Sequence, residues 1–194
     1  MYRCRIIIIS GPSGSGKTTL YRKLLVSRRF KGKLVKSISA TTRPRRLGER
    51  HGRDYLFISK KDFLQKKKNG YFLEWEKVFD NYYGTPDGRV KGLLKKGKNV
   101  LLCIDVKGAK TVRRAYPDSV TIFIKTPSWN ILKQRLEHRG SEAKKDLSLR
   151  LSVAKKELLE AKHYDHIVVN GRLPTALWHL KNIIDRTLNT KERC

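Results

Sequence analysis

The sequence has few cysteines, few acidic residues and no long apolar run. Its three cysteines, Cys4, Cys103 and Cys194, lie far apart, without a CxxC pair or a histidine at metal-ligand spacing. This pattern excludes a disulfide framework and a cysteine-based zinc site, and it indicates a reducing compartment. The apolar run near the amino terminus is too short for a signal peptide and ends in a glycine-rich loop. With no other long apolar segment, we expect a soluble, cytoplasmic protein.

The shortage of acidic residues leaves a large positive charge. There are 45 lysines and arginines against 17 aspartates and glutamates, a formal net charge of +28. Such an excess implies anionic partners, although it does not say which. Much of it lies in residues 60–61, 66–68 and 95–96, which we expect on exposed helix faces. A solvated basic surface with weak, non-specific nucleic-acid binding is favoured over a dedicated RNA site, because no RNA-binding motif with interleaved aromatic residues is present.

Short apolar runs alternate with helical patterns over much of the chain. Residues 6–9 are entirely apolar, as in a strand buried on both faces of a parallel sheet, and residues 17–29 carry leucines at helical spacing. Further strands are predicted at 100–104, 120–124 and 167–169, with helices between them and a last helix at 174–188. This alternation predicts a three-layer α/β fold with a parallel central sheet, and 194 residues fit one such domain.

Two segments interrupt this alternation. The first, between residues 36 and 98, predicts strands at 34–39 and 55–58, a basic helix at 60–68 and a loop rich in Tyr, Gly, Pro and Asp. The second lies between a helix starting at Thr126-Pro127, as N-cap and first helical residue, and a helix at 146–161. We therefore expect a core (1–36, 98–134 and 151–189), an inserted lobe (about 37–97) and a helical lid (about 135–150).

A phosphate-binding loop follows the first predicted strand. Residues 11–18, GPSGSGKT, match GxxxxGK[ST] and lie between a strand and a helix, as the P-loop motif requires. Its backbone N–H groups can surround the donor phosphates, Lys17 can reach the transferred phosphate, and the Thr18 hydroxyl can bind Mg²⁺. We expect the following residues to bind ATP: Gly11, Pro12, Ser13, Gly14, Ser15, Gly16, Lys17, Thr18 and Thr19. The motif alone fixes only nucleotide binding, so the acceptor must be identified elsewhere.

Four further motifs closely resemble those of guanylate kinases. They are SATTRPRRLGE at 39–49, GRDY at 52–55, FLEW at 72–75 and NYYGTP at 81–86. They occur in the family's order, and together with the P-loop, IDxxG at 104–108 and the later arginines the resemblance covers nearly the whole chain. It implies a kinase that transfers a phosphoryl group from ATP to GMP and dGMP with Mg²⁺, using the inserted lobe to bind GMP.

The chemistry of GMP explains these residue types. A dianionic phosphate is held well by guanidinium and phenol groups, which Arg43, Arg46, Tyr55 and Tyr83 supply. Guanine presents two adjacent donors, and the Glu74 carboxylate complements them, whereas adenine offers an acceptor at N1. By the resemblance, the base is also bound by Ser39, Thr85 and Asp105.

Arginines take the place of a general base. The GMP phosphate is already largely ionised at neutral pH, with a second pKa of about 6, so the enzyme has to align phosphates and neutralise charge. Arg135 and Arg139 lie four residues apart, and Arg150 follows the interruption. The resemblance places Arg135 near the ATP base, Arg139 and Arg150 with Lys17 and Arg43 at the transferred group, and Asn170 at adenine.

The sequence departs from the family pattern at several positions. Cys103 and Lys107 stand where an acidic residue and a glutamine are usual, Gly171 replaces an acid, and the proline of the first arginine motif is shifted to Pro44. Three alternatives therefore stay open: a kinase for another phosphorylated acceptor, such as a ribose bisphosphate; a non-catalytic phosphopeptide-binding module; and a nucleic-acid-binding protein. Glu74, Thr85 and Asp105 argue against the first and the complete P-loop against the second. The third would show a steep salt dependence of RNA binding and no competition by GMP. We expect the protein to be either a monomer or a homodimer.

Overall fold

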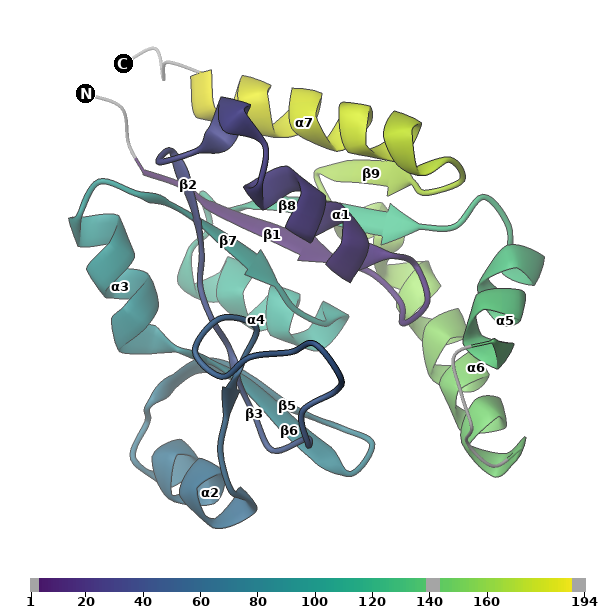
Figure 1. Cartoon of the computed structure of the whole chain (residues 1–194), viewed down its shortest axis with the longest axis horizontal. Coiled ribbons are helices and arrows are strands. Elements are labelled where there is room, and N and C mark those ends of the chain that lie inside the picture. The colour runs from purple at the N-terminus through teal and green to yellow at the C-terminus, as the bar shows by residue number, and fades with distance from the viewer. Residues whose placement is uncertain (1–3, 139–143, 190–194) are drawn as a thin grey trace.

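A five-stranded parallel sheet forms the centre of the molecule. The computed structural model describes residues 4–138 and 144–189 (Figure 1). All pairings in this sheet are parallel, which confirms the predicted α/β class. In spatial order the strands are β2 (Leu34–Lys36), β7 (Asn99–Cys103), β1 (Ile6–Ser10), β8 (Val120–Lys125) and β9 (His166–Val169).

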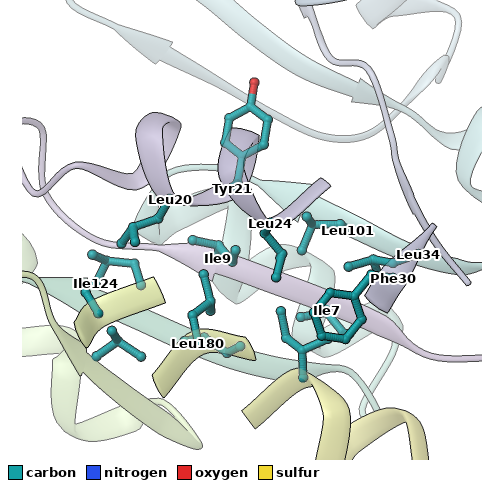
Figure 2. Packing of buried hydrophobic residues seen from close by; sticks show 14 residues of the cluster. Ile7, Ile9, Leu20, Tyr21, Leu24, Phe30, Leu34, Leu101, Ile124 and Leu180 are labelled. Atoms are coloured by element: carbon teal, nitrogen blue, oxygen red, sulfur yellow. The ribbon is translucent and has the colours of Figure 1, made fainter. Parts of the chain in front are cut away.

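Helices cover both faces of this sheet, and β1 supplies side chains to each. Ile7 and Ile9 pack with Leu20, Leu24 and Leu180 on the face covered by α1 and α7 (Figure 2). Ile6 and Ile8 pack toward α3 and α4 on the other face. The prediction of a strand buried on both sides is thus confirmed. The helical segments are α1 (Lys17–Leu25), η1 (Arg28–Phe30), α3 (Asp87–Lys95), α4 (Val106–Ala115), α5 (Trp129–Glu137), α6 (Lys144–Leu159), η2 (Glu160–His163) and α7 (Leu173–Asn189).

A second, smaller sheet carries the acceptor motifs. Its order is β4-β3-β6-β5; β3 is parallel to β4 and antiparallel to β6, and β5 and β6 form an antiparallel hairpin. Phe63 of the adjoining helix α2 is fully buried and stacks on Phe72 at a centroid distance of 4.5 Å. The elements are β3 (Ala40–Thr41), β4 (Leu56–Phe57), α2 (Lys60–Lys68), β5 (Phe72–Val78) and β6 (Asn81–Pro86).

The two sheets are joined by a very short connection. The backbone N–H of Ser37 donates to the carbonyl oxygen of Leu101 in the large sheet, at 3.0 Å. Only two residues later, the carbonyl oxygen of Ser39 accepts from Leu56 of the small sheet, at 2.9 Å. Ile38 between them is buried.

Three local predictions are wrong. The strand expected at 34–39 is divided, because residues 34–36 pair with β7 of the large sheet and residues 40–41 pair with β4 and β6. The segment expected as a Tyr, Gly, Pro and Asp loop is strand β6 with the start of α3, since Glu74 and its neighbours on β5 provide a pairing partner. The N-cap of α5 is Ser128, whose hydroxyl accepts from Ile131 N at 3.3 Å; Thr126 lies two residues earlier.

Within residues 4–138 and 144–189, no helix has the length and apolar character needed to cross a bilayer.

Candidate active site

The glycine-rich loop turns at the carboxyl end of β1, between β7 and β8. A Cβ atom on Gly11 would lie 2.2 Å from the carbonyl oxygen of Ile124, so the loop passes directly against β8 and requires glycine there. The Lys17 ammonium donates to the carbonyl oxygens of Gly11, at 2.5 Å, and Pro12, at 2.9 Å. Helix α1 starts at Lys17, so the N–H groups of its first turn face the same space. The loop therefore forms a cradle for anions.

Asn170 braces this loop from the end of β9. Its buried side-chain amide donates to the carbonyl oxygen of Ser15 at 2.8 Å, and a Cβ on Gly16 would lie 2.1 Å from that nitrogen. Arg135 donates to the carbonyl oxygen of Asn170 at 3.1 Å. Both residues thus lie beside the P-loop, and the Asn170 amide is bonded to the loop itself.

Arg43 lies at the centre of a group of aromatic and charged side chains. Its guanidinium is 5.7 Å from the Tyr55 ring centroid, Tyr83 lies close enough to affect the Arg43 pKa, and the two tyrosine rings are 6.1 Å apart. Glu49 holds Arg43 by two hydrogen bonds of 3.0 Å and accepts another from the backbone N–H of Arg46 at 2.9 Å. The structure therefore brings together three of the four predicted phosphate-binding residues, while Arg46 is exposed beside them.

The predicted base-binding residues form a buried cluster next to this group. Glu74 of β5 is paired in register with Thr85 of β6, and its carboxylate accepts a short hydrogen bond from the Thr85 hydroxyl. The hydroxyl groups of Thr85 and Ser39 are 3.4 Å apart. All three side chains are at most 8% exposed, so any base bound here meets groups removed from water.

Asp105 connects this cluster to the P-loop. It is the N-cap of α4, and its carboxylate accepts from Gly108 N at 2.8 Å. A Cβ on Gly108 would lie 2.5 Å from a Glu74 carboxylate oxygen and 3.5 Å from Asp105, so α4 and β5 meet closely. Burial raises the pKa of Asp105, while the Gly108 N–H and the charge of Lys17 oppose that shift.

Comparison with known proteins agrees with this geometry. The family model described as guanylate kinase matches residues 3–187. The chain belongs to the guanylate kinase family. It is similar to the guanylate kinases of Lactobacillus acidophilus (43% identity, covering 93% of this chain and 87% of that protein) and Rubrobacter xylanophilus (40% identity over the full length of both). Its fold matches the crystal structure of guanylate kinase from Anaplasma phagocytophilum, with a TM-score of 0.78, 29% identity and coverage of 98% and 89%.

Cys103, one of the departures noted in the sequence, lies near two lysines. Cys103 is a free cysteine at the end of β7, and the charges of Lys17 and Lys36 act on it. Burial raises the thiol pKa, whereas these two lysines lower it. Lys36 donates to the Tyr21 hydroxyl at 3.0 Å and lies 5.4 Å from the Tyr55 ring centroid. The cation of Lys36 thus stands where phosphate-binding side chains gather.

Three carboxylates of the site were missed by sequence reasoning. Glu49 orients Arg43, as described above. Asp54 accepts from Arg22 and Arg53, each at 2.8 Å, and from the backbone N–H of Arg50 at 2.9 Å. Glu157 of α6 accepts from the backbone N–H of Ser13 in the P-loop. Glu49 and Asp54 stand within the quoted motifs, but only the fold reveals what each one contacts.

Burial dominates the electrostatics of Glu74. It raises the pKa of this carboxyl to about 8, and the nearby Asp105 and Glu76 charges add to the shift, although the Thr85 hydroxyl opposes it. Glu74 is therefore mostly protonated at neutral pH in the nucleotide-free protein.

The arginines of the expected lid are only partly described. Arg139 lies outside the described residues. Arg150 of α6 is positioned over the ring of Phe79, 5.4 Å from its centroid, and Phe79 lies at the turn between β5 and β6 with φ of 54°. Helix α6 thus contacts the hairpin of the small sheet.

The side chains around Thr18 suit a magnesium ion. Thr18 is in the first turn of α1, with an exposed side chain, and Asp105 lies close enough to the P-loop for Lys17 to affect its pKa. A hydroxyl and a carboxylate are hard oxygen ligands, and Mg²⁺ usually takes its other ligands from phosphates and water.

Proposed function

We propose that this protein transfers the terminal phosphoryl group of ATP to GMP or dGMP, forming ADP and GDP or dGDP. The observation that carries the proposal is the contact between the two subsites. The buried Glu74 cluster lies against Asp105 and Gly108, and Asp105 in turn lies within the field of Lys17 in the P-loop. An acceptor bound at Glu74 therefore has its phosphate directed toward the donor cradle.

Residues 11–19 bind ATP, and Arg135 and Asn170 lie beside them. The loop's N–H groups and Lys17 bind the β- and γ-phosphates, and the Asn170 amide keeps the loop in shape by its bond to Ser15. Thr18, with Asp105 nearby, would hold Mg²⁺, which would neutralise phosphate charge. Lys17 stabilises the charge that develops on the transferred group.

The small sheet and the loops that join its strands bind GMP. Arg43, Arg46, Tyr55 and Tyr83 bind the GMP phosphate, and Glu49 fixes the direction of the Arg43 guanidinium. Glu74 receives the two guanine donors, and Thr85, Ser39 and Asp105 complete the contacts to the base. Adenine would leave these buried groups unpaired, which is the basis of discrimination. The acceptor phosphate then attacks without a general base, and Arg139 and Arg150 cover the transferred group.

The test is the acceptor range of the purified protein. ADP release is measured with ATP, Mg²⁺ and, separately, GMP, dGMP, AMP, CMP and UMP. Activity confined to the two guanine nucleotides is expected. If no monophosphate is phosphorylated although ATP and GMP bind, the chain is a binding module and the kinase proposal fails.

The outer face of α2 supports a second, weaker function, the non-specific binding of nucleic acid. Lys67 lies 3.6 Å from the Trp75 ring centroid and Lys66 lies 4.6 Å from that of Tyr71. Both rings are about two-fifths exposed, at 37% and 41%. Although the sequence shows no interleaved basic and aromatic motif, the fold places them side by side, as on surfaces that stack single-stranded bases.

This second function is tested with a labelled single-stranded oligonucleotide at several salt concentrations. We expect steep weakening with salt, a shallower salt dependence after Lys66→Gln and Lys67→Gln, and no displacement by GMP. Displacement by GMP would assign the binding to the active site. We also propose that the protein acts as a monomer or homodimer in a reducing, cytoplasmic compartment, which suits the free thiols of Cys4 and Cys103.

A further inference from the structure

Helix α6 carries a carboxylate for which the proposed reaction has no use. Glu157 lies seven residues after Arg150, which is about two helical turns, so both lie on the same side of α6. Ala154 lies between them on that side and packs against Leu132 and Leu136 of α5. Those two leucines also lie beside the P-loop, 3.2 and 3.3 Å from where a Cβ on Gly14 would be. Helices α5 and α6 are thus packed on the donor site.

The surroundings of Glu157 are those of a bound anion. Its carboxylate accepts from the backbone N–H of Ser13 in the P-loop, and the charge of Lys17 acts on it. The other titratable groups close enough to interact are Asp105 of α4 and Tyr164, which follows η2. Burial and the Asp105 charge raise the Glu157 pKa to about 7, whereas Lys17 and the Ser13 N–H lower it.

A donor polyphosphate needs the same groups. The N–H groups of a P-loop and its lysine bind phosphate oxygens, and each of those oxygens is negatively charged or strongly polarised. Two like charges that share one cationic site repel each other, and one must leave or become neutral. A phosphate and an ionised Glu157 therefore compete for Ser13 and Lys17.

We propose that the Glu157 carboxylate occupies a donor-phosphate position at the edge of the P-loop, is displaced when ATP binds, and so transmits donor binding to α6 and Arg150. The inference rests on the proposed kinase function. Glu157 is a positioning residue in this scheme, because it keeps the cradle ordered before the donor arrives and touches neither substrate afterwards.

The test compares nucleotide affinities of the wild type and Glu157→Gln, measured by calorimetry with ATP, ADP and AMP. Removing the competing charge while keeping the side-chain size should tighten ATP binding by about twofold at pH 7 and about tenfold at pH 8, because a carboxyl with a pKa of about 7 is half ionised at pH 7 and almost fully ionised at pH 8. ADP should gain less, and AMP, which has no β- or γ-phosphate, should be unaffected. Glu160→Gln is the matched control, because Glu160 pairs with Lys110 at 3.4 Å away from the P-loop; its affinities should equal those of the wild type.

Amide hydrogen exchange over residues 147–159 provides the second readout. In the wild type, ATP should change the protection of α6, and in Glu157→Gln the nucleotide-free protein should already show the ATP-bound pattern. Weaker or unchanged ATP binding in Glu157→Gln, with its melting temperature preserved, overturns the proposal. A protein that binds ATP with these shifts yet phosphorylates no GMP would instead contradict the kinase function alone.

Discussion

Glu74 in the small sheet is buried and Glu157 on α6 is partly buried. Burial raises the pKa of Glu74 to about 8 and that of Glu157 to about 7. Their neighbours differ. Glu74 faces hydroxyl groups and other acids, whereas Glu157 faces the Lys17 ammonium and a P-loop N–H. Guanine brings hydrogen-bond donors to the first, and ATP brings negative charge to the second. The GMP site, which we call the acceptor half, therefore needs Glu74 ionised when GMP binds. The P-loop site, which we call the donor half, needs Glu157 displaced or neutral when ATP binds.

The largest effect should come from removing the charge at Glu74. In Glu74→Gln the amide cannot accept both guanine donors, and we expect kcat/KM for GMP to fall by about 100-fold to 1,000-fold. ATP affinity should stay within about twofold, because the donor half is intact. Steady-state kinetics and ATP calorimetry measure the two. The control is Glu137→Gln, an exposed residue of α5 paired with Lys133. If ATP affinity fell as much as kcat/KM for GMP, the two sites would not act independently.

Gly108→Ala should weaken the acceptor half without changing any charge. Its Cβ would lie 2.5 Å from the buried Glu74 carboxylate, which must shift. We expect the KM for GMP to rise by about tenfold, corresponding to about 1.4 kcal/mol of lost binding. Gly92→Ala is the matched control, because nothing lies within 4 Å of its added Cβ in α3. That variant should keep full activity and unfold at a slightly higher temperature. A normal KM in Gly108→Ala would mean that Glu74 does not contact GMP.

Asn170→Ala should affect the donor half in a similar way. Loss of the 2.8 Å bond leaves the buried Ser15 carbonyl unpaired, at a cost of about 1–3 kcal/mol in folding free energy. We expect the KM for ATP to rise by about threefold to tenfold, and the KM for GMP to stay unchanged. Urea unfolding and steady-state kinetics provide the measurements, with the exposed Asn130→Ala as control. Equal changes in both KM values would argue that the loop and the small sheet respond as one unit.

The smallest effect is the number of protons that are released or taken up when each nucleotide binds. A carboxyl with a pKa of about 8 is mostly protonated at pH 7, so GMP binding should release about 0.9 proton. ATP binding should take up about half a proton at Glu157, seen as the difference between the wild type and Glu157→Gln. Calorimetry at pH 7 in buffers of different ionisation enthalpy measures both. The same sign reasoning predicts that nucleotide-free Glu74→Gln loses less stability than the wild type as pH rises from about 4.5 to 8. Proton uptake on GMP binding would contradict the role of Glu74.

The sequence predicted the donor loop well because its chemistry is local. One run of eight residues contains the glycines, Lys17 and Thr18, and the strand and helix that flank it are strongly patterned. The base-binding set of Glu74, Thr85 and Ser39 was found only through resemblance, since β5 and β6 must pair before these side chains meet. Glu157 was missed because its contact with Ser13 joins residues from opposite ends of the chain, and no local pattern distinguishes it from Glu160, the glutamate three residues later.

The connection between the two sheets has a mechanical consequence. Ser37 is hydrogen-bonded to the large sheet and Ser39 to the small one, so Ile38 alone separates residues fixed to each body. Bending at this crossing is therefore confined to the few backbone dihedral angles around Ile38, which is buried. Any rotation of the small sheet at this crossing would move Arg43 and Glu74 together, so phosphate and base contacts would approach the P-loop in a single motion.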